Sequence, residues 1–176
     1  MQTQPIAQGA AEEAVTGLYH AHALRLTRLA YVMLGDHGLA EDIVQDAFAG
    51  LHRRRGRLSD PSRAVFYLRT SVLDGCRTVL RRSSAARALT LVDIWEGPMT
   101  VAASAETAAL SAEERRALMS AIRRLPARQR EALVLRCYLD EPEAEIARLM
   151  KIRPGTVRST MYRALAALGR LLEETP

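Results

Sequence analysis

The sequence predicts an all-α protein, built from two small helical domains that a flexible acidic linker joins. Three observations lead to this class. Apolar residues recur at steps of three and four along most of the chain, and no stretch alternates as a half-buried strand would. The net charge is +4 over residues 1–88, −3 over 89–110 and +4 over 111–176. The middle segment contains Gly97 and Pro98 and then a run rich in Ala, Ser and Thr, which is typical of a linker.

The composition narrows the functional classes. The chain has 176 residues, of which 48% are hydrophobic and 26% charged, as is typical of globular proteins. A membrane helix needs about 20 apolar residues, and a secretory signal needs a basic start before an apolar run; the sequence has neither. Cys76 and Cys137 lack metal-ligand spacing, so we expect no metal, no other cofactor and a location in the reducing cytoplasm.

The basic charge is almost entirely arginine, since Lys151 is the only lysine. The net charge is +5 and the isoelectric point is near 9.8. Guanidinium groups bind phosphates through two hydrogen bonds and stack on bases. A nucleic-acid partner is therefore indicated, and a solvated basic surface is the alternative interpretation.

The first domain, residues 12–86, is predicted to contain three helices. The first carries an apolar stripe on Val15, Leu18, Tyr19, His22, Leu26, Leu29, Ala30 and Met33. The second follows a break at Gly35 and Gly38 and carries a stripe on Ala40, Ile43, Val44, Ala47, Phe48 and Leu51. The third begins near Pro61 and buries Val65, Leu68, Val72, Cys76 and Val79. We interpret His22 as a packed core residue rather than a ligand.

The second domain, residues 111–174, is predicted to open with a capped helix. Ser111 and Glu114 have the spacing of a capping box, in which each side chain satisfies a backbone N–H of the other residue. The helix behind them ends near Leu125, because Pro126 disfavours helical geometry at the residue before it.

Two further helices and a tight connection lead to the last helix. The two helices cover about residues 127–139 and 141–150, and residues 151–153 form the connection. The last helix begins at Pro154 and buries Val157, Met161, Ala164, Leu165, Leu168 and Leu172. A short helix, a three-residue turn and a longer helix form the layout of a helix-turn-helix.

The second helix of such a motif enters the DNA major groove through its N-terminal residues. The helical period turns Val157 and Met161 inward. It leaves four side chains for DNA, which are Arg158, Ser159, Tyr162 and Arg163. An arginine can bind guanine O6 and N7 together, and Thr156 at the helix N-terminus suits a phosphate. The alternative is the ordinary surface of a helical hairpin.

Two blocks of the sequence match conserved motifs of a known family. Residues 125–136 read LPARQREALVLR, and with 145–147 (EIA) and 155–159 (GTVRS) they look like the fourth conserved region of bacterial sigma factors. Residues 40–48 read AEDIVQDAF and look like the second conserved region. The resemblance covers roughly residues 15–172. The lack of room for the other sigma regions points to the compact extracytoplasmic-function (ECF, group IV) sigma factors.

The resemblance implies a sigma factor that binds core RNA polymerase, directs it to specific promoters and helps to melt the minus-ten region. In the family, a helix of the second region docks on the largest polymerase subunit. The matching positions here are Glu41, Asp42, Gln45, Asp46 and Phe48. The period leaves the four polar side chains outside the core, where acidic charge could steer a basic partner. A solubilising acidic face is the alternative.

The next helix resembles the element that opens promoter DNA and holds the non-template strand. The positions implied for minus-ten contacts are Phe66, Tyr67, Arg69, Asp74, Arg77, Arg81 and Arg82. Aromatic rings can stack on unpaired bases, and we expect at least one of Phe66 and Tyr67 outside the core. Asp74 stands where family members commonly have Asn. A carboxylate cannot donate as an amide does and it repels phosphate, so we expect a different minus-ten base preference.

The resemblance also implies roles for the last helix and for the linker, and it implies one further partner. The minus-thirty-five contacts are implied for Arg153, Thr156, Arg158, Ser159, Tyr162 and Arg163. Arg153 replaces a small capping residue, which gives up about 1 kcal/mol of capping but can add a phosphate contact. The acidic linker, with Asp93, Glu96 and Glu106, would occupy the polymerase channel until nascent RNA displaces it. An anti-sigma factor is a further partner, since many ECF members have one.

Two other classes compete with this interpretation. A stand-alone helix-turn-helix regulator would need a dimer interface and a palindromic site, and it leaves residues 40–48 unexplained. An enzyme would need a catalytic constellation. The sequence contains no Gly-rich phosphate loop, no GxSxG and no metal-ligand cluster, so we do not expect an enzyme.

Overall fold

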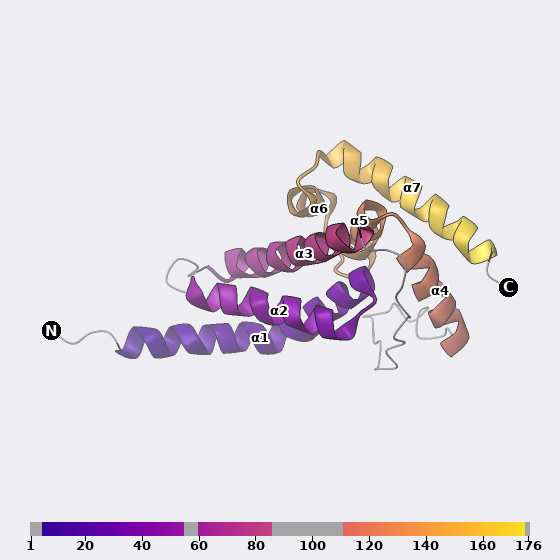
Figure 1. Ribbon diagram of the computed structural model, residues 1–176. Helices are drawn as coiled ribbons and strands as arrows, with labels where there is room; N and C mark the ends of the chain where they lie inside the picture. Colours follow the sequence, from indigo (N-terminus) through magenta and orange to yellow (C-terminus); the bar gives the residue numbers. More distant parts are fainter. Residues whose placement is uncertain (1–4, 55–59, 86–110, 175–176) are drawn as a thin grey trace. The chain divides into compact units, whose positions relative to one another are not determined.

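The computed structural model describes residues 5–54, 60–85 and 111–174, and this part of the chain is helical without strands (Figure 1). The helices are α1 (Pro5–Leu34), α2 (His37–Arg53), α3 (Pro61–Ala85), α4 (Ala112–Arg124), α5 (Ala127–Cys137), α6 (Glu143–Met150) and α7 (Pro154–Glu173). The all-α prediction is therefore confirmed for these residues. The predicted linker, with Asp93, Glu96 and Glu106, lies outside them. No helix within the described ranges is long and apolar enough to cross a membrane.

The chain divides into two compact units. The first comprises residues 1–31 and 36–88 and holds most of α1 together with α2 and α3. The second comprises residues 32–35 and 89–176 and holds α4 to α7.

The break between α1 and α2 has a local cause. Gly35 follows the last residue of α1 with a φ of +77°, a left-handed conformation that glycine adopts without steric cost. Asp36 is the N-cap of α2, and its carboxylate accepts a hydrogen bond from the Leu39 N–H at 2.9 Å. These two residues end one helix and start the next.

The buried face of the first unit follows the predicted stripes in most positions. The residues that are buried as predicted are Leu26, Leu29, Ala30, Met33, Ala40, Val44, Ala47, Phe48, Leu51, Leu68, Val72 and Cys76. Val15, Leu18, His22, Ile43, Val65 and Val79 are only half-buried. The placement of Tyr19 in the core was wrong, because its side chain is exposed. Ala64 and Leu73 are buried as well, since a core-facing helix buries a stripe wider than one residue per turn.

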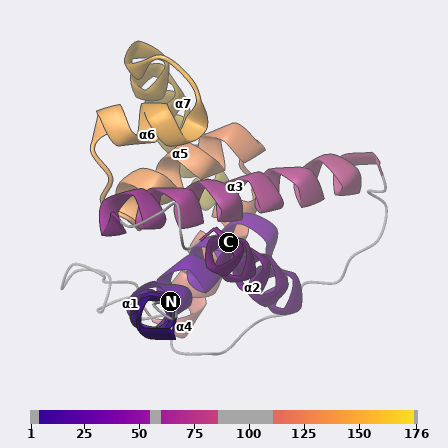
Figure 2. The same cartoon turned by 90° about the vertical axis from the view of Figure 1, so that its left-hand side faces the viewer.

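Helices α2 and α3 pack against each other, as both views show (Figure 1 and Figure 2). Gly75 of α3 lies directly against Ile43 of α2: a Cβ atom added at Gly75 would lie 2.8 Å from Ile43 Cγ2. Real Cβ atoms essentially never approach a neighbour that closely. The missing side chain of Gly75 therefore sets the short distance between the two helices.

The second unit begins with the predicted capping box. The Ser111 hydroxyl accepts from the Glu114 N–H at 3.1 Å, and the Glu114 carboxylate accepts from the Ser111 N–H at 2.6 Å. The hydrogen bond from the Ser111 N–H, and then that from the Ser111 side chain, stabilise the ionised carboxylate and lower the pKa of Glu114. The helix α4 that they start ends at Arg124, next to Leu125 as predicted.

The predicted boundaries of α5 and α6 were each two residues too wide at one end. Helix α5 ends at Cys137 rather than at residue 139, and α6 begins at Glu143 rather than at residue 141. The cause lies in the residues between them. Asp140 has a φ of +54°, which no right-handed helix allows, and Pro142 is the extended N-cap of α6.

Helix α7 packs against α4, α5 and α6, and its neighbour α6 lies beside it in both views (Figure 1 and Figure 2). Between α6 and α7, Lys151 adopts a left-handed conformation with a φ of +57°. The N–H of Ile152 then donates to Ala147 O at 3.0 Å, which closes the end of α6. Arg153 is the extended N-cap of α7, and Pro154 occupies its first turn.

The predicted core face of α7 was right at Val157 and Ala164 and wrong at Leu165 and Leu172. These two leucines are 54% and 38% exposed. At 3.6 residues per turn, a stripe through Val157 passes residues 160–161, 164, 168 and 171, and Leu165 and Leu172 lie about 80° and about 60° from Val157 around the helix axis, at the edge of this stripe. Thr160 is buried in this stripe, while Met161 and Leu168 are half-buried.

Candidate functional site

The first half of α7 exposes the side chains that the sequence predicts for DNA contacts. The members of this α7 DNA face are Arg153, Thr156, Arg158, Ser159, Tyr162 and Arg163, and all six are exposed. Val157, Thr160 and Ala164 are buried on the opposite side of the same helix. The packing of the second unit therefore fixes the direction in which this face points away from the core.

The N-terminus of α7 has the features of a phosphate site. Arg153 makes no side-chain capping hydrogen bond, as its residue type predicts. Its carbonyl oxygen accepts from the N–H groups of Thr156 at 2.9 Å and Val157 at 3.2 Å, which starts the helix. The positive end of the helix dipole lies next to the arginine, and both favour an anion.

Within the α7 DNA face, two polar groups make contacts on their own helix. The Ser159 hydroxyl donates to the Thr156 carbonyl at 3.1 Å, and Arg163 Nε donates to the Ser159 carbonyl at 3.2 Å. The Ser159 oxygen can therefore still accept a hydrogen bond. Arg163 is exposed, and its guanidinium carries further N–H donors besides the Nε–H of this contact.

Arg158 is held from the neighbouring helix α6. Its Nη2 donates to Glu143 Oε1 at 3.1 Å, and its Nε donates to Glu143 Oε2 at 3.3 Å. Glu143 is not among the site residues that the sequence predicts. The two residues are 15 positions apart, and only the turn between α6 and α7 brings them together. Opposite charges at the starts of two consecutive helices are the one sequence signal that could have indicated this pair.

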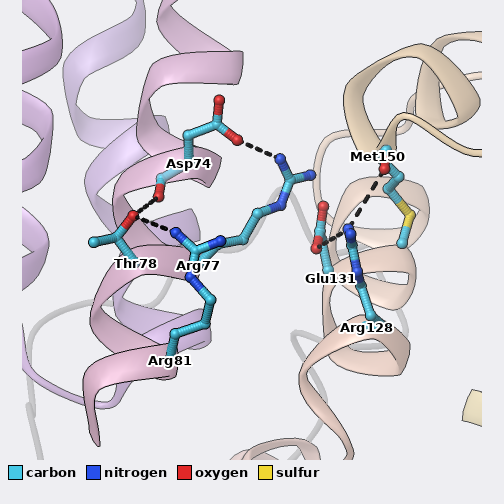
Figure 3. A network of polar contacts seen from close by, with 7 residues as sticks. All are labelled: Asp74, Arg77, Thr78, Arg81, Arg128, Glu131 and Met150. Carbon is cyan, nitrogen blue, oxygen red and sulfur yellow. Dashed lines mark hydrogen bonds and ion pairs between the residues drawn. The ribbon is translucent and has the colours of Figure 1, made fainter.

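Two arginines of the LPARQRE block, the exposed Arg128 and the buried Arg130, hold helices of the second unit together. Arg128 Nη1 donates to the buried Glu131 carboxylate at 3.3 Å and to Met150 O at 3.4 Å, which connects α5 to the end of α6 (Figure 3). Arg130 is buried, and its Nη2 donates to the carbonyl of Arg123 and, at 3.1 Å, to that of Leu125. The block thus ties α5 to the helices on both sides of it.

In the first unit, α2 exposes four of the five side chains predicted for polymerase contacts. This acidic α2 face consists of Glu41, Asp42, Gln45 and Asp46. His37 Nδ1 lies 3.5 Å from the Glu41 carboxylate at one end of it. Phe48, the fifth predicted residue, is only 6% exposed, and its ring lies edge-on to Tyr19 with 5.0 Å between centroids. Phe48 is therefore a packing residue in this structure.

Helix α3 carries the residues predicted for minus-ten contacts. Phe66, Tyr67 and Arg69 are half-buried, and Arg81 and Arg82 are exposed. The Tyr67 ring is held by the end of α2: its hydroxyl accepts from Arg54 Nη1, and Arg54 Cζ lies 5.1 Å from the ring centroid. Sequence reasoning missed Arg54, which lies 13 positions before Tyr67 and across the α2–α3 connection.

Asp74 forms an ion pair with Arg77 one turn further along α3 (Figure 3). The Thr78 hydroxyl donates to the Asp74 carbonyl at 2.8 Å, and Arg81 Nη2 donates to Thr78 Oγ1 at 3.1 Å. The pairing offsets the repulsion between the Asp74 carboxylate and a phosphate. It also engages Arg77, for which the family resemblance implies a minus-ten contact.

His22 of α1 lies close enough to α3 to be influenced by its charge. Burial lowers the pKa of His22, and the nearby guanidinium groups of Arg69 and Arg25 lower it further. The imidazole is therefore favoured in its neutral form beside Arg69, which is one of the residues predicted for minus-ten contacts.

The sequence matches two family descriptions of the sigma-70 class. "Sigma-70 region 2" matches residues 18–86, and "Sigma-70, region 4" matches residues 115–168. The first match covers the helices that carry the acidic α2 face and the α3 aromatics. The second covers most of α4 and all of α5 and α6, and it includes the α7 DNA face.

Named relatives define the class further. The chain is 33% identical to the ECF RNA polymerase sigma factor SigM of Mycobacterium tuberculosis over 155 residues, which cover 88% of this chain and 75% of SigM. It is 30% identical to the RNA polymerase sigma factor CarQ of Myxococcus xanthus, with 93% and 92% of the two chains covered. The chain belongs to the ECF sigma factors. As a member of this family it binds core RNA polymerase and directs it to promoters.

Solved structures share the fold. CnrH, in a complex with the cytosolic domain of CnrY, matches with a TM-score of 0.66 and 21% identity, covering 96% of this chain and 98% of CnrH. RpoE of Bartonella quintana, in a complex with the anti-sigma factor NepR, matches with a TM-score of 0.61 and 21% identity, covering 86% and 91%. At these identities the likeness supports the fold alone.

Proposed function

We propose that the α7 DNA face reads the minus-thirty-five promoter element, with α6, the turn and α7 acting as a helix-turn-helix. One observation carries the proposal: the six predicted side chains are all exposed on one face of a helix whose other face is core. A helix of this kind enters the major groove by its N-terminal residues. Arg153 and Thr156 at its start would bind phosphate, and Arg158, Ser159, Tyr162 and Arg163 would meet base edges or the flanking backbone.

The test of this proposal is promoter binding by the holoenzyme. The promoter is first obtained by run-off transcription on a library, and Arg158→Ala and Arg163→Ala are then compared with the unmodified chain. A base-reading arginine should change preference at one base pair by about 1–3 kcal/mol, whereas a phosphate-binding one should lower affinity evenly and reduce the salt slope by about one.

Arg170→Ala is the matched control for these variants. Arg170 is an exposed arginine near the other end of α7, so its loss removes the same charge from the same helix outside the α7 DNA face. If all three substitutions have equal effects, or if none has an effect, the assignment of the face is wrong.

For the minus-ten element, we infer that α3 holds the melted strand. Phe66 and Tyr67 are partly exposed and would stack on unpaired bases, and Arg69, Arg81 and Arg82 would contact the backbone of that strand. Arg54 holds the Tyr67 ring from one side, which favours a fixed platform at that position. Binding to unpaired bases would offset the cost of unstacking them, so opening would need no ATP.

For the polymerase contact, the proposal rests on the acidic α2 face. Its residues, Glu41, Asp42, Gln45 and Asp46, are exposed on a basic chain, so they suit a basic surface on core polymerase. Phe48 would support this face from below through its contact with Tyr19.

Four parts of the proposal rest on the family rather than on described residues. The linker acids Asp93, Glu96 and Glu106 would run through the polymerase channel, and neutralising all three should change the ratio of abortive to full-length RNA. An anti-sigma factor would bind this chain as NepR binds RpoE of Bartonella quintana. Membership of group IV is likewise proposed from the family. A cytoplasmic location is proposed as well, because bacterial polymerase works there.

A further inference from the structure

The ion pair between Glu143 and Arg158 connects the start of α6 to the α7 DNA face. Both side chains are accessible, at 79% exposed for Arg158 and 36% for Glu143. The contact is bidentate, because both carboxylate oxygens and two guanidinium nitrogens take part: Nη2 donates to Oε1 at 3.1 Å and to Oε2 at 3.2 Å, and Nε donates to Oε2 at 3.3 Å. A fork-to-fork contact of this kind fixes the orientation of the guanidinium plane as well as its position.

The geometry of the contact decides which donors of Arg158 remain for DNA. A guanidinium group has a side edge, formed by Nε and Nη2, and an end edge, formed by Nη1 and Nη2. Glu143 binds the side edge. The end edge still presents two parallel N–H donors, which is the pattern that matches guanine O6 and N7.

The charge of the pair separates two roles for Arg158. A phosphate attracts an arginine chiefly through net charge, and the carboxylate of Glu143 cancels most of that charge at close range. Hydrogen bonds to a base edge depend on direction, which the same carboxylate improves by holding a long flexible side chain in place. The pairing thus weakens phosphate binding and favours base reading.

Arg163 provides the contrast on the same face. Its Nε donates to the neutral carbonyl oxygen of Ser159 at 3.2 Å, so this contact leaves the positive charge in place. Arg163 therefore keeps its electrostatic attraction for a phosphate.

We propose that Glu143 is a positioning residue that makes Arg158 a reader of guanine in the minus-thirty-five element, with Arg163 as its phosphate-binding neighbour. The proposal rests on the assignment of the α7 DNA face above. A well-formed bidentate arginine–guanine contact discriminates about 5- to 150-fold against another base. Glu143 contributes to this discrimination without contacting the base.

The experiment measures holoenzyme binding to the library-derived promoter and to duplexes with each minus-thirty-five base pair replaced in turn. Arg158→Ala should abolish a guanine preference of about 5- to 150-fold at one base pair. Glu143→Gln keeps the shape of the side chain and removes its charge. It should reduce the preference at that same base pair at least about 3-fold and steepen the salt slope by about one. In the Arg158→Ala background, Glu143→Gln should have no effect on the base preference.

Glu145→Gln is the matched control, because Glu145 pairs with Arg148 at 2.9 Å on the same helix and away from Arg158. It should leave the base preference unchanged. If Glu143→Gln raises affinity equally for every duplex, Glu143 masks Arg158 and the inference is overturned. If Arg158→Ala lowers the affinity evenly and changes no preference, Arg158 binds phosphate and the inference is overturned while the DNA face stands. If Arg158→Ala has no effect on binding, the DNA face itself is misassigned and the proposed function fails first.

Discussion

At the scale of single residues, Asp74 shows how a neighbour changes what a side chain can do. Its residue type alone suggests a carboxylate that repels the DNA backbone. In the structure the carboxylate is paired with Arg77, so the repulsion is offset and the guanidinium is partly withdrawn from other uses. The remaining difference from an amide is the missing N–H donor.

A substitution at this position tests that difference. Asp74→Asn restores a donor and removes the charge that pairs with Arg77, so base preference at one minus-ten position should change by about 1–3 kcal/mol. The free energy of unfolding should fall by no more than about 1 kcal/mol, because the lost ion pair is partly exposed. Run-off transcription on a library varied at the minus-ten element measures the preference, and an identical preference would contradict the placement of Asp74 near a base.

His22 gives the first unit a pH dependence with a definite sign. Its pKa in the folded chain lies below the ordinary value of 6.5, chiefly because of burial and then because of Arg69 and Arg25. The unfolded chain therefore takes up this proton at a higher pH than the folded chain does, and stability falls as the pH drops through 6.5 toward the folded pKa.

His22→Gln should remove this part of the pH dependence. Urea unfolding at pH 7.5, 6.5 and 5.5 would show a smaller loss of stability on acidification for the variant than for the unmodified chain. Equal losses in the two proteins would mean that His22 titrates as it does in the unfolded chain.

At the scale of helices, the contact between α2 and α3 depends on one missing side chain. Gly75→Ala gains about 1 kcal/mol of helix propensity but places a Cβ against Ile43, and overpacking of this kind costs about 1–3 kcal/mol. We expect a net loss of up to about 2 kcal/mol in the free energy of unfolding. Ile43→Ala in the same chain removes the clash. The double variant should therefore lose less free energy of unfolding than the sum of the losses in the two single variants.

A double-mutant cycle by urea unfolding measures this coupling. The control is Gly169→Ala on α7, where an added Cβ meets no atom within 4 Å and only the gain in propensity should remain. Additive losses at Gly75 and Ile43 would show that the helices have room to accommodate the methyl group.

The helices themselves could be predicted from periodicity, and several ends could be predicted from Ser111, Pro126 and Pro154. The errors have physical causes. Leu165 and Leu172 were assigned to the core because they are leucines one residue beyond the true stripe. The pairs Glu143–Arg158 and Arg54–Tyr67 are 15 and 13 residues apart, and their contact depends on the turn geometry between two helices. No periodic pattern within a single helix contains that information.

At the scale of the whole molecule, acidic and basic side chains gather on different surfaces instead of being evenly mixed. The acidic α2 face lies on a chain with a net charge of +5, and the α7 DNA face carries three arginines. One surface thus suits a basic protein partner and the other suits DNA, as a protein that connects a polymerase to a promoter requires.

Charge reversal should separate these two surfaces. Asp42→Arg combined with Asp46→Arg should abolish co-purification with core polymerase while leaving the helical content and the unfolding midpoint nearly unchanged, because both side chains are exposed. Glu12→Arg combined with Glu13→Arg makes the same change of charge on exposed residues of α1 and serves as the control. Retained association of the Asp42 and Asp46 variant would refute docking through the acidic α2 face.

The central claim is that this chain gives core polymerase its promoter specificity through two elements. Run-off transcription on a promoter library, with cognate core polymerase and with or without the chain, tests it most directly. We predict transcripts only when the chain is added, with two shared sequence blocks near minus ten and minus thirty-five. No transcript from well-folded chain and active cognate core, or transcripts without a shared block at minus thirty-five, would contradict the claim.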